Sequence, residues 1–203
     1  MGGNTYWSFA NPAEEGDPIT WTGEVDTDWF NSANWVDRYG DARGVAPGDR
    51  VSIPSAPTNQ PVARAGDIAV CDLTVEAGAS LELDRANLTV TNALSVVGSL
   101  TADGNERISC LGSVAFAGAS TYSGARATFA LTGNVAQDVM FGGKSFGIFE
   151  ITKNGGEARF ADGLTADMFS LLAQGPFAVE YRSGATYAFG EFMASGYVGG
   201  ESA

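Results

Sequence analysis

The chain contains no histidine. Histidine is the commonest general base and transition-metal ligand, and it is the side chain that usually changes charge near neutral pH. Its absence excludes Ser-His-Asp hydrolase triads, zinc sites of the usual type and haem ligation by histidine. Any catalysis would therefore rest on carboxylates and the few basic side chains.

Basic residues are also scarce. Lys and Arg together number 11 against 24 Asp and Glu, which gives a net charge of −13 and a pI of about 4.2. Because phosphate binding needs clustered Lys and Arg, this balance argues against a nucleic-acid partner and against docking on an anionic membrane. No apolar run in the sequence approaches the roughly 18 residues of a membrane-spanning helix, so we expect no membrane insertion by this segment.

Glycine and short apolar segments are abundant instead. Charged residues make up only 17% of the chain and glycines number 27, a composition that favours a β-rich fold with tight turns over long helices. Between residues 73 and 122, a Gly-Ala-Ser or Gly-Ser segment begins at positions 78, 98 and 118, at steps of 98 − 78 = 20 and 118 − 98 = 20. Apolar-x-apolar segments recur at steps of 20 or 21 in two further columns, at 73–75, 94–96 and 114–116 and at 88–90 and 108–110. A period of about 20 residues built from short strands and turns predicts a parallel β-solenoid, with phenylalanines stacked inside it.

This pattern divides the chain into four parts. We expect residues 1–18 to form a flexible lead-in and residues 19–66 to form an N-terminal cap with the first strands. We expect residues 67–194 to form the solenoid rungs and residues 195–203 to form a frayed tail. The boundaries follow the shift from polar and turn-rich sequence to regularly spaced apolar segments.

The two cysteines, Cys71 and Cys110, lie 110 − 71 = 39 positions apart, or about two rungs. Rungs stack at roughly 4.8 Å, which separates the two residues by about 10 Å, whereas a disulfide needs Cα atoms closer than about 7 Å. The spacing predicts two buried free thiols, and it leaves the redox compartment open.

Three of the four tryptophans, Trp21, Trp29 and Trp35, lie close together near the N-terminus. One interpretation is a cap, in which bulky side chains close the first rung, because a solenoid end otherwise exposes its core and its unpaired strand edges. The other is a glycan-binding surface, in which indole faces stack on sugar rings. The cap interpretation predicts that the three indoles are mostly buried.

Acidic and amide side chains lie between these tryptophans. Asp26, Asp28 and Asn31 supply oxygen atoms of the kind that calcium takes as ligands. Their spacing does not match an EF-hand loop, and Asp and Asn are also the ordinary residues of turns and caps. The sequence therefore leaves two alternatives, a calcium site and a loop with no cofactor.

A family resemblance accompanies these patterns. Residues 19–23 (Ile-Thr-Trp-Thr-Gly), 26–35, 47–54, 59–62 and 73–81 resemble an opening found in many large secreted bacterial proteins. Residues 133–137, 146–151, 153–156 and 164–171 resemble a rung repeat of the same class, so that the resemblance covers most of residues 19–190. It implies a right-handed parallel β-helix of the surface adhesin and autotransporter-passenger type, located outside the cell or on its surface. The motifs are structural and carry no catalytic residues.

Three functions remain open. The first is a non-catalytic stalk or adhesive segment that contacts glycans or surface proteins, as a monomer or with weak end-to-end association through its terminal rungs. The second is a carbohydrate-binding module that uses the three tryptophans. The third is a polysaccharide-active β-helix enzyme, since such chemistry uses paired carboxylates or a cation beside them. Candidate residues for the enzyme are Glu76, Glu82, Asp84, Asp103, Glu106, Glu150 and Glu157, with Arg85 and Arg107.

Overall fold

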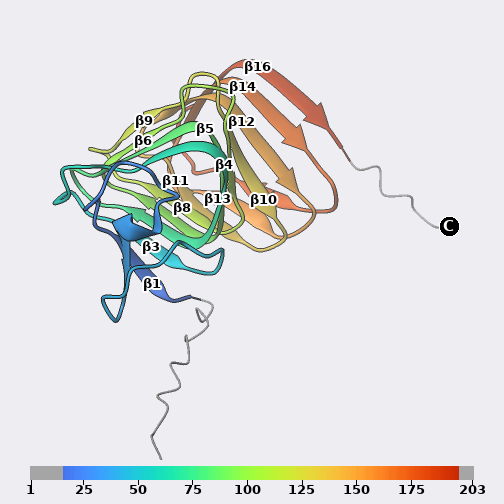
Figure 1. Ribbon diagram of the computed structural model, residues 1–203. Helices are drawn as coiled ribbons and strands as arrows, with labels where there is room; N and C mark the ends of the chain where they lie inside the picture. The colour runs from blue at the N-terminus through green and yellow to red at the C-terminus, as the bar shows by residue number, and fades with distance from the viewer. Residues whose placement is uncertain (1–15, 197–203) are drawn as a thin grey trace, which may run out of the picture.

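The computed structural model describes residues 16–196 (Figure 1). Apart from one short 3-10 helix, all of its regular elements are strands. Their bounds are β1 Pro18–Trp21, η1 Ser32–Asn34, β2 Trp35–Asp37, β3 Arg50–Ile53, β4 Val62–Val75, β5 Ser80–Val96, β6 Ser99–Thr101, β7 Arg107–Cys110, β8 Ser113–Phe116, β9 Thr121–Ser123, β10 Thr128–Gly133, β11 Gln137–Met140, β12 Ser145–Lys153, β13 Glu157–Phe160, β14 Leu164–Leu172, β15 Ala178–Glu180 and β16 Tyr187–Ser195. No helix of the described residues is long and apolar enough to cross a membrane.

The strands stack as a parallel β-solenoid of about seven turns, with rungs of about 21 residues. One column contains β3, the ends of β4 and β5, and then β8, β11, β13 and β15. A second contains the middle of β4 and of β5, and then β7, β10, β12, β14 and β16. A third contains the starts of β4 and β5 with β6 and β9. The predicted solenoid is confirmed, while its right-handed winding stays a prediction.

Bends within the long strands take the chain from one column to the next. Ala65 and Gly66 in β4 have φ angles of 56° and 125°, and Arg85 in β5 has a φ angle of 62°. Left-handed backbone is costly for residues with a Cβ, and at Arg85 the fold compensates with a buried carboxylate. Glu106 is buried and its Oε1 accepts a hydrogen bond of 2.9 Å from the Arg85 backbone N–H.

Two of the predicted columns match the observed register. Leu73 pairs with Leu94 and Leu94 with Val114, while Leu88 pairs with Ile108. The predicted glycine column is wrong at both of its steps, because Ser80 pairs with Ser99 at a step of 99 − 80 = 19 and Ser99 pairs with Thr121 at a step of 121 − 99 = 22. A turn closes before this strand, where the Ser120 N–H and hydroxyl both donate to the Ala117 carbonyl, at 3.0 and 2.6 Å.

Stacked phenylalanines occupy the core of the solenoid from β10 onward, as the sequence predicts, and continue a column that begins with Ile68, Leu88 and Ile108. The Phe129 and Phe149 rings are 6.0 Å apart and nearly parallel at 9°, and the Phe169 and Phe189 rings are 4.6 Å apart at 26°. Phe149 links the two pairs through a contact of 5.9 Å with Phe169. Stacked aromatic pairs of this kind add stabilisation beyond the area that they bury, so the core connects successive rungs along the axis.

The cysteines follow the predicted spacing. Val70, the neighbour of Cys71, pairs with Val90, which pairs with Cys110 on the next rung, and both thiols are free. Cys110 is buried, but the expectation that both are buried is wrong for Cys71, which is half-buried. Cys71 follows the buried Val70 and so takes the outward position, and the register shift between Val70 and Asp72 makes Leu73 the next inward residue.

Candidate binding site at the N-terminal cap

The three tryptophans of the cap are packed on one another. All three side chains are buried, and Trp35 lies edge-on between Trp21 and Trp29, at centroid distances of 4.9 and 4.6 Å. Their strands explain this arrangement, because β1 and β2 pair antiparallel with Trp21 opposite Trp35. The predicted burial is confirmed. The indole faces contact protein atoms, so they offer no exposed stacking surface to a sugar.

The indole N–H groups bond to the loops around the cap. Trp21 donates to the Asn59 carbonyl at 2.7 Å, and Trp35 donates to the Trp29 carbonyl at 2.8 Å. Gly23 lies against the same Asn59 carbonyl and has a φ angle of 58°. A Cβ at this position would lie 2.3 Å from the Asn59 carbonyl oxygen. Trp21 and Gly23 therefore hold the loop at 54–61 against the end of β1.

Asn34 organises the loop that carries the predicted calcium ligands. Its side chain is buried, and its Oδ1 accepts from the backbone N–H groups of Val25 and Asp26 at 3.0 and 3.1 Å. Its Nδ2 donates to Asp26 Oδ1 at 2.6 Å and to the Asp28 carbonyl at 3.0 Å. The amide thus uses both of its donors and both of its acceptor lone pairs.

The structure brings Asp26, Asp28 and Asn31 together, but their oxygens already accept hydrogen bonds. Asp28 Oδ1 accepts from the Phe30 N–H and Asn31 Oδ1 from the Ala33 N–H, and Asn31 Nδ2 donates to Asp26 Oδ2 at 3.0 Å. The hydrogen bonds from Asn34, Asp28 and Asn31 lower the pKa of Asp26. Among residues 16–196, no group of three or more His, Cys, Asp or Glu side chains is placed to hold a metal ion. These contacts favour a structural loop over a cation site.

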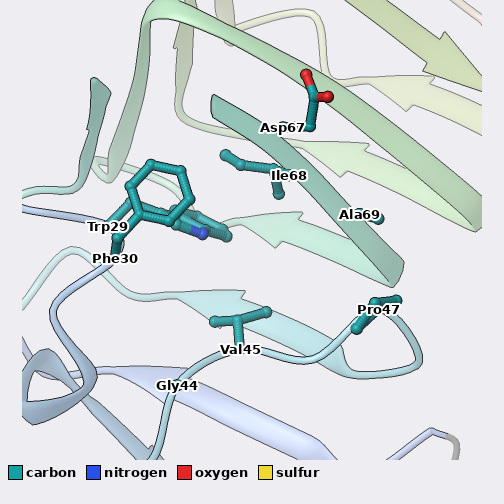
Figure 2. Close-up of a pocket in the computed structure, with 8 residues that line it drawn as sticks. All are labelled: Trp29, Phe30, Gly44, Val45, Pro47, Asp67, Ile68 and Ala69. Atoms are coloured by element: carbon teal, nitrogen blue, oxygen red, sulfur yellow. The ribbon is translucent and has the colours of Figure 1, made fainter. Parts of the chain in front are cut away.

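A cavity of about 190 Å³ lies beside the cap, between β4 and the loop before β3 (Figure 2). Trp29 and Phe30 line one side, and Asp67, Ile68 and Ala69 of β4 line another. The remaining lining comes from the loop, at Gly44, Val45 and Pro47. Figure 2 shows the Phe30 ring beside Trp29, with the Asp67 carboxylate pointing away from the other labelled side chains.

Phe30 is the exposed aromatic residue of this site. Its side chain is 48% exposed, and its ring lies over Gly66, where an added Cβ would come within 3.2 Å of Phe30 Cζ. The ring is therefore held by the bend of β4 and still presents part of its surface to solvent. The sequence pattern selected the neighbouring tryptophans as the candidate aromatic residues and missed Phe30. The signal for Phe30 is the Asx turn at Asp28, in which the Asp28 carboxylate accepts from the Phe30 N–H.

The open edge of β4 forms one wall of the cavity. β4 pairs with Asp28 at Val62 and with β3 from Asp72 onward. The Cys71 N–H also donates to the Asp49 carbonyl at 2.9 Å. Between these points, no strand of the described residues pairs with the outer edge of β4, which leaves backbone polar groups beside the apolar cavity. Such a site can bind a ligand with an apolar surface and hydrogen-bonding groups.

The acidic residues considered for catalysis are distributed along the solenoid, and Asp103, Glu106 and Glu150 have structural partners. Glu106 also accepts from the Gly104 N–H at 2.7 Å, and Asp103 accepts from the Ser123 hydroxyl at 2.5 Å. Glu150 pairs with Arg107 and accepts from the Thr152 hydroxyl. Burial raises the pKa of Glu150, but the hydrogen bonds from Arg107 and Thr152 outweigh it, so the net pKa is lowered. A proton donor at neutral pH needs the opposite shift.

Comparisons with known protein families, with curated proteins and with solved structures find no match to this chain. The structure alone therefore assigns this chain to a structural class, the parallel β-solenoids.

Proposed function

We propose that the protein is a non-catalytic structural or adhesive segment of a secreted or cell-surface bacterial protein. In this function the solenoid is a rigid stalk, and its outer face makes contacts with glycans or surface proteins. The observation that carries the proposal is the continuous aromatic column from Phe129 to Phe189. Because each rung is packed on the next, the stabilising contacts lie inside, and the outward side chains are free to serve recognition.

Ladders of polar side chains on the outer surface support a structural function. Asn87 donates to Asp67 at 2.9 Å and Asn92 donates to Asp72 at 2.7 Å, each across one rung of 20 residues. Of the carboxylates that would serve catalysis, Asp103, Glu106 and Glu150 have the hydrogen bonds described above. A side chain held in this way stabilises the stack, while an enzyme needs it directed into a cleft beside a second group.

The proposal is tested by a glycan-array screen, with and without calcium, together with turnover assays on acidic and neutral polysaccharides. We expect no turnover, and we expect the melting temperature to be unchanged by calcium at about 10 mM, above the weakest dissociation constants of extracellular calcium modules. Turnover that is lost in Glu150→Gln would contradict the proposal. A calcium-dependent rise in melting temperature that is lost in Asp26→Asn would instead assign the cap loop as a calcium site.

A carbohydrate-binding function is the second candidate, and the exposed ring of Phe30 beside the cap cavity favours it. The sugar-stacking face would then be Phe30 and not the buried indoles. Array hits that disappear in Phe30→Ala, and persist in the matched variant Phe192→Ala at the other end of the solenoid, would support this function. Hits that persist in both variants would place recognition elsewhere on the outer face.

A further inference from the structure

The outer edge of β4 beside the cap cavity carries backbone groups that face away from the solenoid. The Cys71 N–H points to this edge, because it donates to the Asp49 carbonyl at 2.9 Å, whereas the Val70 carbonyl points to β5 and accepts from the Thr91 hydroxyl at 3.3 Å. Successive residues of a strand direct their backbone polar groups to opposite sides, so the groups of Ala69 face the outer edge. Within the described part of the chain, no strand pairs with β4 there. The edge is thus a template for one more strand.

Apolar surface accompanies this open edge. The cavity of about 190 Å³ lies between the edge and the loop that carries Val45 and Pro47, and the ring of Phe30 at its rim is 48% exposed (Figure 2). The buried Ile68 and the half-buried Ala69 belong to the same stretch of β4. A strand added here would pair its backbone with β4 and place a side chain in the cavity, which is how sheet edges bind extended segments. The site therefore fits an extended segment with a large apolar side chain.

Residues 5–9 of the same chain have the composition of such a strand. The segment reads Thr-Tyr-Trp-Ser-Phe, and it lies outside the residues that the structure describes. Threonine and the aromatic residues are enriched in strands, and three of these five residues are aromatic, unlike the polar remainder of the predicted lead-in. The segment contains Trp7, the fourth tryptophan of the chain besides the three of the cap.

The described structure begins beside the cavity. The Gly16 N–H donates to the Gly48 carbonyl at 2.7 Å, and Pro47, the residue before Gly48, lines the cavity. Phe9 lies seven positions before Gly16 (16 − 9 = 7), and a connection of seven residues spans up to about 23–25 Å. The edge of β4 at Cys71 is about two strand spacings from Gly16, or roughly 10 Å. The connection is therefore long enough for residues 5–9 to reach the open edge.

We propose that residues 5–9 pair with the outer edge of β4 in the same chain, as a parallel strand with Trp7 beside Ile68 in the cavity. Both β3 and β5 pair with β4 in parallel, and this direction ends the added strand on the side of the connection to Gly16. A segment on a short tether has an effective concentration in the millimolar range, which favours it over a free peptide or another protein. The Trp7 indole and the exposed part of Phe30 are then removed from water.

The first experiment is acrylamide quenching of tryptophan fluorescence in the full chain. The three cap indoles are buried, and the difference between each chain and the same chain with Trp7→Phe isolates the emission of Trp7. We expect this emission to be protected in the unmodified chain and to become accessible in Phe30→Asp, which places a charge at the rim of the cavity. Phe192→Asp, at a position 60% exposed in β16, is the matched control and should leave Trp7 protected.

Two results of this experiment would overturn the proposal. One is a Trp7 emission that is already fully quenched in the unmodified chain, and the other is equal protection in Phe30→Asp and Phe192→Asp. Circular dichroism checks that both variants keep the β-fold, since each changes an exposed side chain.

Hydrogen exchange at the edge of β4 tests the backbone pairing itself. We expect the Ala69 amide to be protected in the unmodified chain and to exchange at least about tenfold faster in Trp7→Asp, because that variant keeps the edge but loses the apolar contact. The Cys71 amide is the internal control, since its bond to the Asp49 carbonyl does not involve the added strand. An Ala69 amide that exchanges equally fast in both chains would show that the edge stays open.

A cross-link tests the register and the chain from which the strand comes. The proposed register places Ser8 opposite Ala69, so in a Cys71→Ser background Ser8→Cys with Ala69→Cys should form a disulfide within one chain. Thr89 pairs with Ala69 one rung further on. Ser8→Cys with Thr89→Cys should not form a disulfide, because two rung spacings, about 10 Å, exceed the roughly 7 Å that a disulfide spans. A disulfide between two chains would show that the edge binds the segment of a second copy, and it would overturn the contact within one chain.

Discussion

The side chain of Asn34 makes four hydrogen bonds inside the cap loop and is buried there. Asn34→Ala removes these bonds and leaves the backbone N–H groups of Val25 and Asp26 without their partner. Because a hydrogen bond contributes about 0.5–1.5 kcal/mol and four are lost, we expect the free energy of unfolding to fall by about 2–4 kcal/mol in chemical denaturation.

Asn31→Ala is the matched control for this prediction. Asn31 is the N-cap of η1 and its side chain accepts from the Ala33 N–H in an exposed part of the same loop. The loss of an exposed cap costs about 1 kcal/mol, so the control should lose much less stability than Asn34→Ala. Equal losses in the two variants would contradict the central function of Asn34 in the loop.

The ion pair between Arg107 and Glu150 links two rungs that are not adjacent and makes stability depend on pH. Burial raises the pKa of Glu150, but the hydrogen bonds of Arg107 and Thr152 lower it more, so the folded pKa lies below the ordinary value of 4.5. The unfolded chain then binds more protons than the folded chain below about pH 4.5. The contribution of Glu150 is therefore complete above this pH and is lost as the pH falls through the folded pKa.

Glu150→Gln tests this dependence. We expect the stability difference between the unmodified chain and Glu150→Gln to be larger at about pH 7 than at about pH 3, as measured by urea denaturation. A difference that does not change with pH would show that the carboxylate contributes only through its shape and its neutral hydrogen bonds.

At the scale of the strands, the aromatic column supplies the packing that holds successive rungs together. Phe129 on β10 is buried and contacts the rings of Phe116, Phe141, Phe146 and Phe149 within 6.0 Å. Phe129→Ala leaves a cavity among these rings. We expect the free energy of unfolding to fall by about 3–5 kcal/mol, while Phe192→Ala on the exposed edge strand β16 should cost less than about 1 kcal/mol. Similar losses would mean that the column does not carry the fold.

Strands were predictable from the sequence where inward and outward residues alternate, because a period of two identifies the buried face without knowledge of the turns. This is why the pairing of Leu73 with Leu94 and of Leu88 with Ile108 follows from spacing alone. The pairing of Ser99 with Thr121 does not, because it depends on how many residues the preceding turn takes.

Buried polar residues where one strand column ends and the next begins were not predictable either, because their contacts depend on the conformation of the turns. Lys153 is the last residue of β12 and begins a sequence typical of a turn. Its side chain is nevertheless buried, and its Nζ donates to the Val135 carbonyl at 2.9 Å and to Gln137 Oε1 at 2.6 Å. Gln137 in turn donates to the carbonyls of Cys110 and Gly112 at 2.8 Å each. Burial lowers the pKa of Lys153. The sequence contains the residues of this network, but only the folded corner brings their polar atoms together.

The candidate site, too, was predictable from the sequence only in part. Clustered tryptophans near a solenoid end predicted a buried cap correctly, because the first rung has to be closed. The exposed ring at the cap cavity belongs to Phe30, and its orientation depends on the hydrogen bond from its N–H to Asp28 Oδ1 at 3.0 Å. A single side-chain contact of this kind has no periodic pattern in the sequence.

At the scale of the whole molecule, the net charge acts against the compact fold. The chain carries −13, and its like charges repel one another over distances set by the Debye length, about 30 Å at 0.01 M salt and about 8 Å at 0.15 M. Self-repulsion of this kind destabilises a compact state, whereas salt does not screen the burial of apolar surface in the core. Raising the salt concentration across this range should therefore raise the free energy of unfolding, as measured by urea denaturation. A free energy of unfolding that falls with salt would show that ion pairs such as Arg107 with Glu150 outweigh the repulsion.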